Sequence, residues 1–131
     1  MHTISYLSRI KKGVDNDALN ELFSITKSNN DRYNVTGTLL FSEGFFFQIL
    51  EGQRDVLKSL FHTIQHDARH EDILIIKNQL TTKRLFKDYR TGFSVLQSKE
   101  EIMNLKKYID HSQLTSTNST YITSILEPFL L

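Results

Sequence analysis

The sequence predicts an α+β fold: a ferredoxin-like βαββαββ sheet with two helices on one face and two C-terminal helices on the other. Three observations predict it. Five segments have the alternating or continuously apolar pattern of strands, two amphipathic helical segments follow the first and third of them, and two helical segments follow the last. At 131 residues, the chain is long enough for one compact core.

The first strand and the first helix have clear boundaries. Along Thr3–Arg9, two sets of side chains alternate with a period of two, which indicates a strand. One set is Ile4, Tyr6 and Ser8, and the other is Ser5, Leu7 and Arg9. Asp15–Asn29 follows as a helix, with an acidic, cap-forming start at its first three residues. The polar cluster Ser28–Asp31 is rich in turn formers and predicts the end of that helix. One face of the helix is formed by Leu19, Leu22, Phe23 and Thr26.

The next two strands form a predicted hairpin. Val35–Phe41 and Phe45–Glu51 flank the three-residue loop Ser42–Gly44, which contains a glycine. The second run is apolar at nearly every position, so we expect it to be buried on both faces. We expect the first and third strands to pair in parallel at the centre of the sheet. The side of the third strand expected to meet the C-terminal helices carries Phe45, Phe47 and Ile49.

The remaining elements follow in order. Arg54–Ala68 is predicted to be an amphipathic helix and Asp72–Leu80 a strand, while Arg84–Val95 has the weaker pattern of a turn and a fifth strand. Glu100–Ile109 and Ser119–Leu130 are predicted helices. Two helices alone would leave one face of the sheet bare, so residues 98–131 are expected to pack on it as a helical extension of a domain that spans residues 1–97.

Composition and charge exclude several classes of protein. Sixteen Lys and Arg against fifteen Asp and Glu leave a net charge of +1, which argues against a protein that grips nucleic acid through its phosphates. Cysteine is absent, which excludes disulfides, thiolate metal sites and cysteinyl adducts of a cofactor. Tryptophan is also absent, so aromatic redox chemistry would fall to the five tyrosines.

Targeting and catalytic motifs are not found in the sequence. No apolar run approaches the roughly 18 residues of a membrane span, and no secretory leader is recognisable, so we expect a cytoplasmic protein. We find no catalytic triad, phosphate-binding loop or metal motif, so we expect the protein not to be an enzyme. The length leaves no room for a linked effector domain, so we expect any output to pass to a separate partner.

Two polar side chains interrupt apolar strands. Gln48 lies within the third strand and Tyr6 in the middle of the first. If these strands are neighbours, both side chains can point from the helix-covered face, and the phenol can satisfy part of the amide. One interpretation is a tyrosine–glutamine bond that only specifies the core, since buried polar groups are usually satisfied within the protein. The other interpretation is a bound ligand that satisfies the hydrogen-bonding groups of Gln48 that Tyr6 does not reach.

Several of these residues also form a recognisable pattern. Tyr6 lies on the first strand, Asn30 precedes Gly37 by seven positions in NDRYNVTG, GFFFQILEG surrounds Gln48, and IQHDARH spans Ile64–His70. The pair Gly92–Phe93 lies near the fifth strand. In this combination the chain resembles the BLUF domain, a blue-light sensor that uses a flavin, over Thr3–Leu96. The resemblance implies that residues 1–97 form a flavin-binding domain.

The resemblance also implies a site. A non-covalently bound flavin, FAD or alternatively FMN, would lie between the two helices with its ring edge against the sheet. Tyr6 would be the light-driven donor of an electron and a proton, and Gln48 would bridge its hydroxyl to the N5/O4 edge of the flavin. Asn30 would bond the carbonyl and N3 edge of the ring. Leu22 and Ile64 would contact the ring, and the ring and ribityl-phosphate end would be lined by Asp67, Arg69 and His70.

The sequence departs from the family at the positions expected to relay the signal. Where family members commonly have Trp followed two residues later by Met, this chain has Tyr89 and Thr91. Thr91 cannot fill the volume of Met, but its hydroxyl could bond the amide of Gln48. We expect light to shift the population of two arrangements of the fifth strand and the C-terminal helices, with a signalling protein or self-association as the output.

Other patterns have simpler interpretations. His62, His66 and His70 recur every four residues, a spacing that could bind a metal on a helix, but a solvated face is the simpler interpretation and we expect no metal. An RNA-recognition motif shares the βαββαβ order, but Glu43 stands where a basic residue is expected. A colourless ferredoxin-like interaction module is the third alternative. We expect neither nucleic acid nor membrane as a partner.

Overall fold

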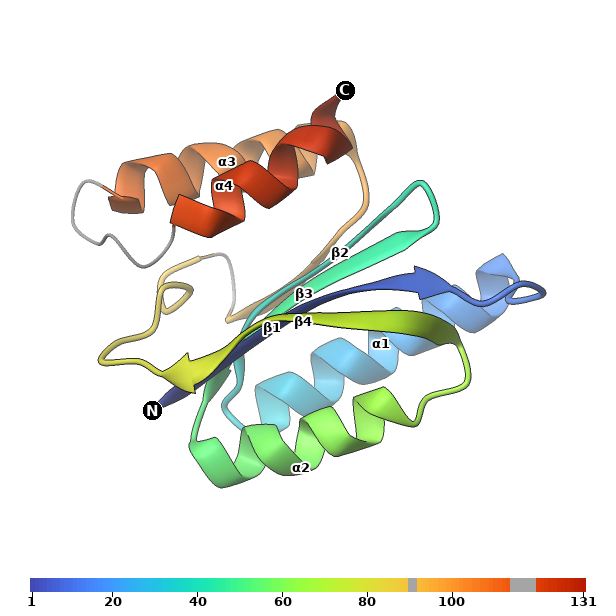
Figure 1. Ribbon diagram of the computed structural model, residues 1–131, viewed down its shortest axis with the longest axis horizontal. Helices are drawn as coiled ribbons and strands as arrows, with labels where there is room; N and C mark the ends of the chain where they lie inside the picture. The colour runs from blue at the N-terminus through green and yellow to red at the C-terminus, as the bar shows by residue number, and fades with distance from the viewer. Residues whose placement is uncertain (90–91, 114–119) are drawn as a thin grey trace. The chain divides into compact units, whose positions relative to one another are not determined.

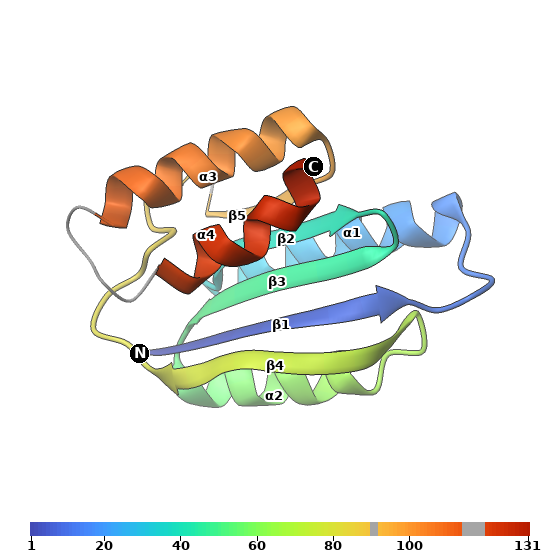
Figure 2. The ribbon, with the colours of Figure 1, turned by 45° about the horizontal axis from the view of Figure 1, so that its top comes forward.

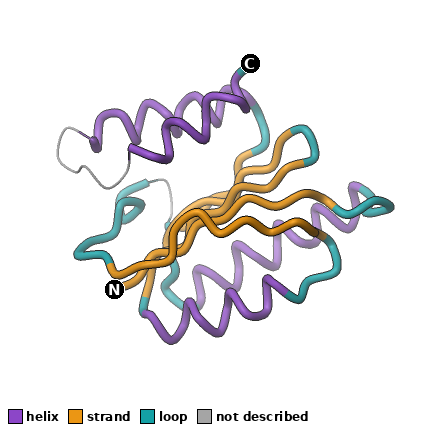
Figure 3. Tube along the Cα trace, viewed as in Figure 1, coloured by secondary structure: helices purple, strands orange, loops and turns teal. Residues whose placement is uncertain are grey.

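The computed structural model describes residues 1–89, 92–113 and 120–131. Its contacts divide the chain into two compact units, Met1–Val95 and Leu96–Leu131. The first unit contains a twisted sheet with two helices on one face, α1 (Asn16–Arg32) and α2 (Arg54–Gln65) (Figures 1 and 3). The sheet is built from β1 (His2–Ile10), β2 (Thr36–Ser42), β3 (Phe45–Gly52), β4 (His70–Leu80) and β5 (Phe93–Leu96).

The strands are arranged in the order β4-β1-β3-β2-β5 (Figure 2). This order and the sequence of elements along the chain confirm the predicted ferredoxin-like βαββαββ fold. β1 and β3 therefore lie side by side near the centre of the sheet, with α1 and α2 against the same face. Neighbouring inner strands carry the two polar residues singled out in the sequence, since Tyr6 lies on β1 and Gln48 on β3.

The direction of the central pair differs from the prediction. β1 and β3 pair antiparallel, with Tyr6 directly opposite Gln48, so the expected parallel pairing is wrong. The reason is the hairpin: it reverses the chain between β2 and β3, so these strands are antiparallel as well. β1 and β2 consequently run in the same direction, as a crossover through α1 requires, and β3 lies between them in the opposite direction.

Helix α1 begins where the sequence predicts and ends later. Asp15 is the N-cap, and its side chain accepts a hydrogen bond from the backbone N–H of Ala18 at 2.9 Å. The helix continues three residues past its predicted end at Asn29. The polar cluster that suggested a turn contains one inward-facing member, because Asn30 extends the buried face of the helix.

The β2–β3 hairpin is tighter than predicted. Ser42 pairs with Phe45, so the loop has two residues rather than three. Both loop residues have positive φ, 52° at Glu43 and 82° at Gly44, as in a type I′ turn. Earlier in β2, Gly37 has φ +140°, and a Cβ there would lie 1.9 Å from the carbonyl oxygen of Ile49. Only glycine allows β2 to approach β3 this closely.

The core of the first unit lies between the sheet and its two helices. Every residue of β3 after Phe45 is buried, which confirms the prediction of a strand buried on both faces, whereas Phe45 itself is 46% exposed. The helix-side core contains Ile4, Tyr6, Leu19, Phe23, Val35, Leu39, Phe46, Leu50, Leu57, Phe61 and Phe93.

The second unit consists of α3 (Lys99–Gln113), α4 (Thr120–Leu126) and a short 3₁₀ helix (Glu127–Leu130). Ser98 and Glu101 form a capping box, since each side chain accepts a hydrogen bond from the backbone N–H of the other. The two C-terminal helices are thus confirmed. Their packing on the sheet and the domain boundary at residue 97 stay predictions. No described helix combines the length and apolar character of a membrane span; the cytoplasmic location stays a prediction.

Candidate functional site

A buried hydrogen bond joins the neighbouring strands β1 and β3 on the helix-covered face. The Tyr6 hydroxyl donates to Oε1 of Gln48 at 2.5 Å, and the side chains are 4% and 2% exposed. Burial, followed by the negative charge of Asp67, raises the pKa of the Tyr6 phenol well above its usual value. The phenol therefore keeps its proton at neutral pH and stays a hydrogen-bond donor.

Two buried amide nitrogens lack partners among the described residues. They are Nε2 of Gln48 and Nδ2 of Asn30, and both amide side chains line the same pocket. A buried donor without an acceptor costs about 1–3 kcal/mol, and such groups are rare in folded proteins. A pocket wall with two of them fits a ligand that presents hydrogen-bond acceptors.

The pocket lies between α1, α2 and the helix-covered face of the sheet. It contains about 710 Å³ of space, counted out to the solvent at its mouth. Its wall combines apolar side chains from both helices and the sheet with polar and charged ones. All eight residues predicted to contact a flavin line it: Tyr6, Leu22, Asn30, Gln48, Ile64, Asp67, Arg69 and His70.

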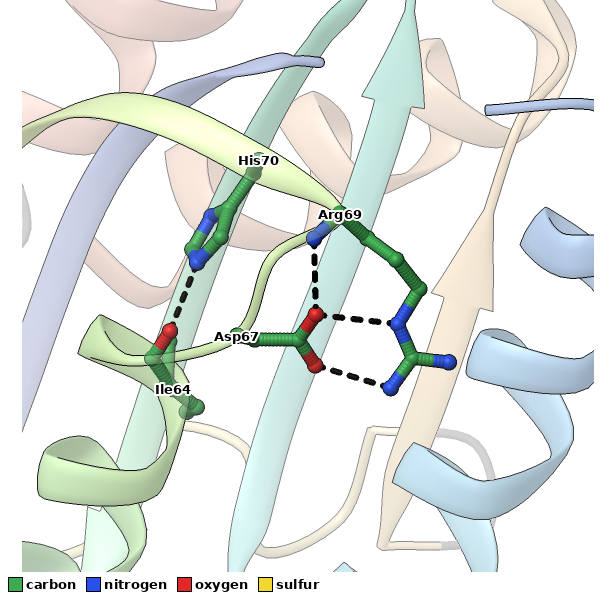
Figure 4. A network of polar contacts seen from close by, with 4 residues as sticks. All are labelled: Ile64, Asp67, Arg69 and His70. Carbon is green, nitrogen blue, oxygen red and sulfur yellow. Dashed lines mark hydrogen bonds and ion pairs between the residues drawn. The ribbon is translucent and has the colours of Figure 1, made fainter. Parts of the chain in front are cut away.

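An ion pair forms one corner of the pocket, just after α2 (Figure 4). Asp67 accepts from the backbone N–H and Nε of Arg69, each at 2.9 Å, and from its Nη2 at 2.8 Å. These bonds lower the pKa of the Asp67 carboxyl and raise the pKa of the Arg69 guanidinium. The carboxylate fixes the guanidinium at the pocket wall.

His70 links three elements through its ring. Nε2 lies 2.6 Å from the carbonyl oxygen of Ile64, and Nδ1 lies 2.7 Å from the hydroxyl of Ser8 (Figure 4 shows the first contact). Because a carbonyl only accepts, Nε2 carries a proton and donates to Ile64, while Nδ1 shares a second hydrogen bond with the Ser8 hydroxyl. The ring therefore joins the end of α2 and the start of β4 to β1, two residues along from Tyr6.

The three regularly spaced histidines do not share a helix. His62 lies on α2, His66 is its C-cap and His70 begins β4. Nδ1 of His66 donates to the His62 carbonyl at 2.8 Å, which is a local helix-end contact. Within the described ranges, no group of three or more His, Cys, Asp or Glu side chains is placed to hold a metal ion.

Sequence reasoning missed part of the pocket wall. Leu39 lies opposite Gln48 in the β2–β3 register, so its side chain leaves the same face of the sheet. The strand register would have identified it, but the register is set by the hairpin turn, and the predicted loop was one residue too long. The other lining residues not predicted are Ile25, Thr26, Asn29, Phe46, Leu60 and Thr63.

Of the two predicted relay positions, the structure describes Tyr89, which lies apart from this wall. Tyr89 is 7% exposed and packs edge-on against Phe86, with ring centroids 5.6 Å apart. It is not among the described residues that line the pocket. Thr91 lies outside the described residues. The relay role of both positions stays a prediction.

Comparison with known proteins gives a consistent result. The family model described as BLUF, sensors of blue-light using FAD, matches residues 1–92. The chain is 31% identical over 74 residues to a photoactivated adenylate cyclase subunit beta of Euglena longa, covering 56% of this chain and 9% of that protein. It is 36% identical over 72 residues to the blue light- and temperature-regulated antirepressor BluF of Escherichia coli, covering 55% and 18%. The chain thus spans less than a fifth of the length of these relatives.

The fold is shared with solved structures. BlrP1 of Klebsiella pneumoniae, solved with FMN and cyclic diGMP, superposes with a TM-score of 0.76 at 26% identity. The superposition covers 95% of this chain and 34% of that one.

Proposed function

This chain belongs to the BLUF family of blue-light sensors that use a flavin, and from this premise we propose how its own residues hold the flavin and respond to light. We propose FAD as the cofactor, with FMN, which is present in the BlrP1 structure, as the alternative. The observation that carries the proposal is the Tyr6–Gln48 bond, whose amide leaves Nε2 without a partner among the described residues.

The residues present fit a flavin ring. The ring presents carbonyl oxygens and a ring nitrogen as acceptors, and the pocket wall offers the amide donors of Gln48 and Asn30. Leu22 and Ile64 supply apolar surface from the two helices, and Arg69 supplies a positive charge for the ribityl-phosphate end. Asp67 and His70 support this wall through the contacts in Figure 4.

A bound flavin supplies blue-light absorption and an oxidising excited state. Tyr6 is the readily oxidised side chain at the pocket wall, and its hydroxyl has one directional acceptor, Oε1 of Gln48. A phenol loses its proton as it loses an electron, so this acceptor determines where the proton goes. The Gln48 amide then rotates or tautomerises and presents a different pattern of donors and acceptors. Tyr6 then regains its electron and its proton, so the lit state retains the same atoms in a rearranged hydrogen-bond network.

The output is proposed to be a change in protein contacts. Light would bias two arrangements of β5 and the following helices, with Tyr89 and Thr91 as relay positions. The receiver would be a signalling protein or a second copy of this chain. We propose a sensor without catalytic activity of its own, since the sequence carries no recognisable catalytic motif.

An absorption spectrum tests the proposal. The purified protein is expected to be yellow, with the vibronic bands of a bound flavin, and to give a red-shifted spectrum after blue illumination that reverts in the dark. The measurement is a spectrum before, during and after illumination, with extracted cofactor identified by mass. A colourless protein that takes up neither FAD nor FMN would contradict it, and RNA binding by that protein would favour the RNA-recognition alternative.

Arg69→Ala is expected to weaken flavin retention about tenfold or more, because it removes the cation from the pocket wall and leaves Asp67 without its partner. The measurement is the dissociation constant of FAD by fluorescence titration. Arg9→Ala is the matched control: Arg9 also pairs with an aspartate, Asp72, but its side chain is 53% exposed and outside the pocket wall. Equal retention in both variants would argue against a phosphate role for Arg69.

A further inference from the structure

A second buried polar centre lies on the other face of β3 from Gln48. Glu51 is 3% exposed, although glutamate is almost never fully buried without partners. Side chains alternate between the faces of a strand, so residues three positions apart point to opposite sides. Glu51 therefore plays no part in the pocket, and it lies about 10 Å along the strand from Gln48 at about 3.3 Å per residue.

The carboxylate of Glu51 is surrounded by donors. Oε1 accepts from the backbone N–H of Phe86 at 2.9 Å and from the Thr36 hydroxyl at 3.0 Å. Oε2 accepts from the backbone N–H of Leu85 at 2.6 Å. A set of partners that all donate matches an ionised carboxylate, which can only accept.

The positive charge of Arg84 lies close to the Glu51 carboxylate, with the Thr36 hydroxyl bridging the two side chains. Nη1 of Arg84 donates to the Thr36 hydroxyl at 3.0 Å, and that hydroxyl in turn donates to Glu51. The same nitrogen contacts the carbonyl oxygens of Asn34 at 2.7 Å and Glu51 at 3.3 Å. Burial raises the pKa of the Glu51 carboxyl, and the backbone N–H groups of Phe86 and Leu85 oppose that rise. The buried carboxylate of Glu51, whose burial costs free energy, thus holds the backbone N–H groups of Leu85 and Phe86.

The held segment leads to a predicted relay position. Leu85 and Phe86 belong to the connection between β4 and β5, which is more than thirty residues from Glu51 along the chain. Phe86 is fully buried and packs against the ring of Tyr89, whose backbone N–H donates to the Phe86 carbonyl at 3.3 Å. The position of Tyr89 thus depends on Phe86, and the position of Phe86 depends on Glu51.

We propose that Glu51 is the positioning residue that couples β3 to Leu85–Tyr89, so that rearrangement of Gln48 on one face of the strand loosens the grip of the carboxylate on the other. The coupling rests on the proposed function, since the event that moves β3 is the change at Gln48. A strand is a continuous element, so a change in its twist at Gln48 also reorients Glu51. Hydrogen bonds to a carboxylate are directional, and a reorientation weakens those from Leu85 and Phe86.

Hydrogen exchange of the full, flavin-loaded chain tests the coupling. In the wild type, the amides of Leu85 and Phe86 are expected to exchange at least tenfold faster under continuous blue light than in the dark. The absorption spectrum of the same sample reports the photoproduct. A red-shifted photoproduct with unchanged exchange at both amides would overturn the coupling and leave the proposed function intact. The absence of any red shift would overturn the proposed function, and the coupling with it.

A variant separates positioning from general stability. Glu51→Gln replaces one acceptor oxygen with a donor group, so at least one of the two backbone N–H groups loses its partner. Its dark exchange at Leu85 and Phe86 is expected to match that of the illuminated wild type, with the red shift kept and the light-minus-dark difference lost. Glu71→Gln, at a surface glutamate on β4 that is 41% exposed, is the matched control and should behave as the wild type. A light-dependent difference that persists in Glu51→Gln would reject Glu51 as the coupling residue.

Discussion

Tyr6→Phe is expected to give a yellow, flavin-loaded protein that forms no red-shifted photoproduct. The variant keeps the aromatic ring that packs in the helix-side core and removes only the hydroxyl that donates to Gln48. Without the phenol, the pocket wall loses its oxidisable group, and the photoproduct yield should fall by two orders of magnitude or more. The measurement is the light-minus-dark absorption spectrum at equal flavin loading.

The control for this variant is Tyr33→Phe, since Tyr33 is 55% exposed and outside the pocket wall. It should retain the wild-type spectrum and photocycle. Tyr6→Phe also leaves Oε1 of Gln48 without its donor, which predicts a loss of about 1–3 kcal/mol in the free energy of unfolding. An unchanged photocycle in Tyr6→Phe would reject Tyr6 as the donor.

Gln48→Leu is expected to bind flavin and lose the red shift completely. Leucine has a similar size and keeps the strand buried, but it cannot accept from Tyr6 or donate into the pocket. Because the proposed lit state is a rearrangement of this amide, no substitute network remains once it is removed. The measurement is again the light-minus-dark spectrum, together with the rate at which flavin emission decays, which reports whether Tyr6 still quenches the excited state.

Gln79→Leu provides the matched control, because Gln79 is a strand glutamine that is exposed on β4. It should leave the spectrum and its light response unchanged. A wild-type red shift in Gln48→Leu would remove this amide from the mechanism, whereas loss of flavin binding in Gln79→Leu would indicate a general defect of the sheet.

Local patterns in the sequence were sufficient to predict the elements of the fold. The period of two in β1 and the apolar stripe of α2 depend only on neighbouring residues, and both elements begin within one residue of the predicted start, although α2 ends at Gln65 rather than at Ala68. Strand direction is a non-local property, and the expected parallel pairing of β1 and β3 failed for that reason. The end of α1 was also misplaced, because composition marks Ser28–Asp31 as polar but does not show that Asn30 points inward.

The part of the candidate site that belongs to sequence motifs could be predicted. The eight predicted contacts line one pocket, since each belongs to a motif or to the helix stripe beside it. Leu39 was missed because only the register places it opposite Gln48. The sequence shows Glu51 as the charged residue of an otherwise apolar strand. Its backbone donors at Leu85 and Phe86 come from a distant connection whose sequence pattern is weak. Partners of that kind cannot be read from spacing.

The direct opposition of Tyr6 and Gln48 across two strands has an evolutionary consequence. A single inserted or deleted residue within β1 or β3 would turn every later side chain of that strand to the other side, and the phenol and the amide would part. Point changes in the pocket lining can be absorbed by repacking, whereas an indel that precedes Tyr6 or Gln48 in its strand separates them unless a β-bulge takes up the change. A descendant of this gene with an uncompensated gap would lose its light response even with both residues still encoded.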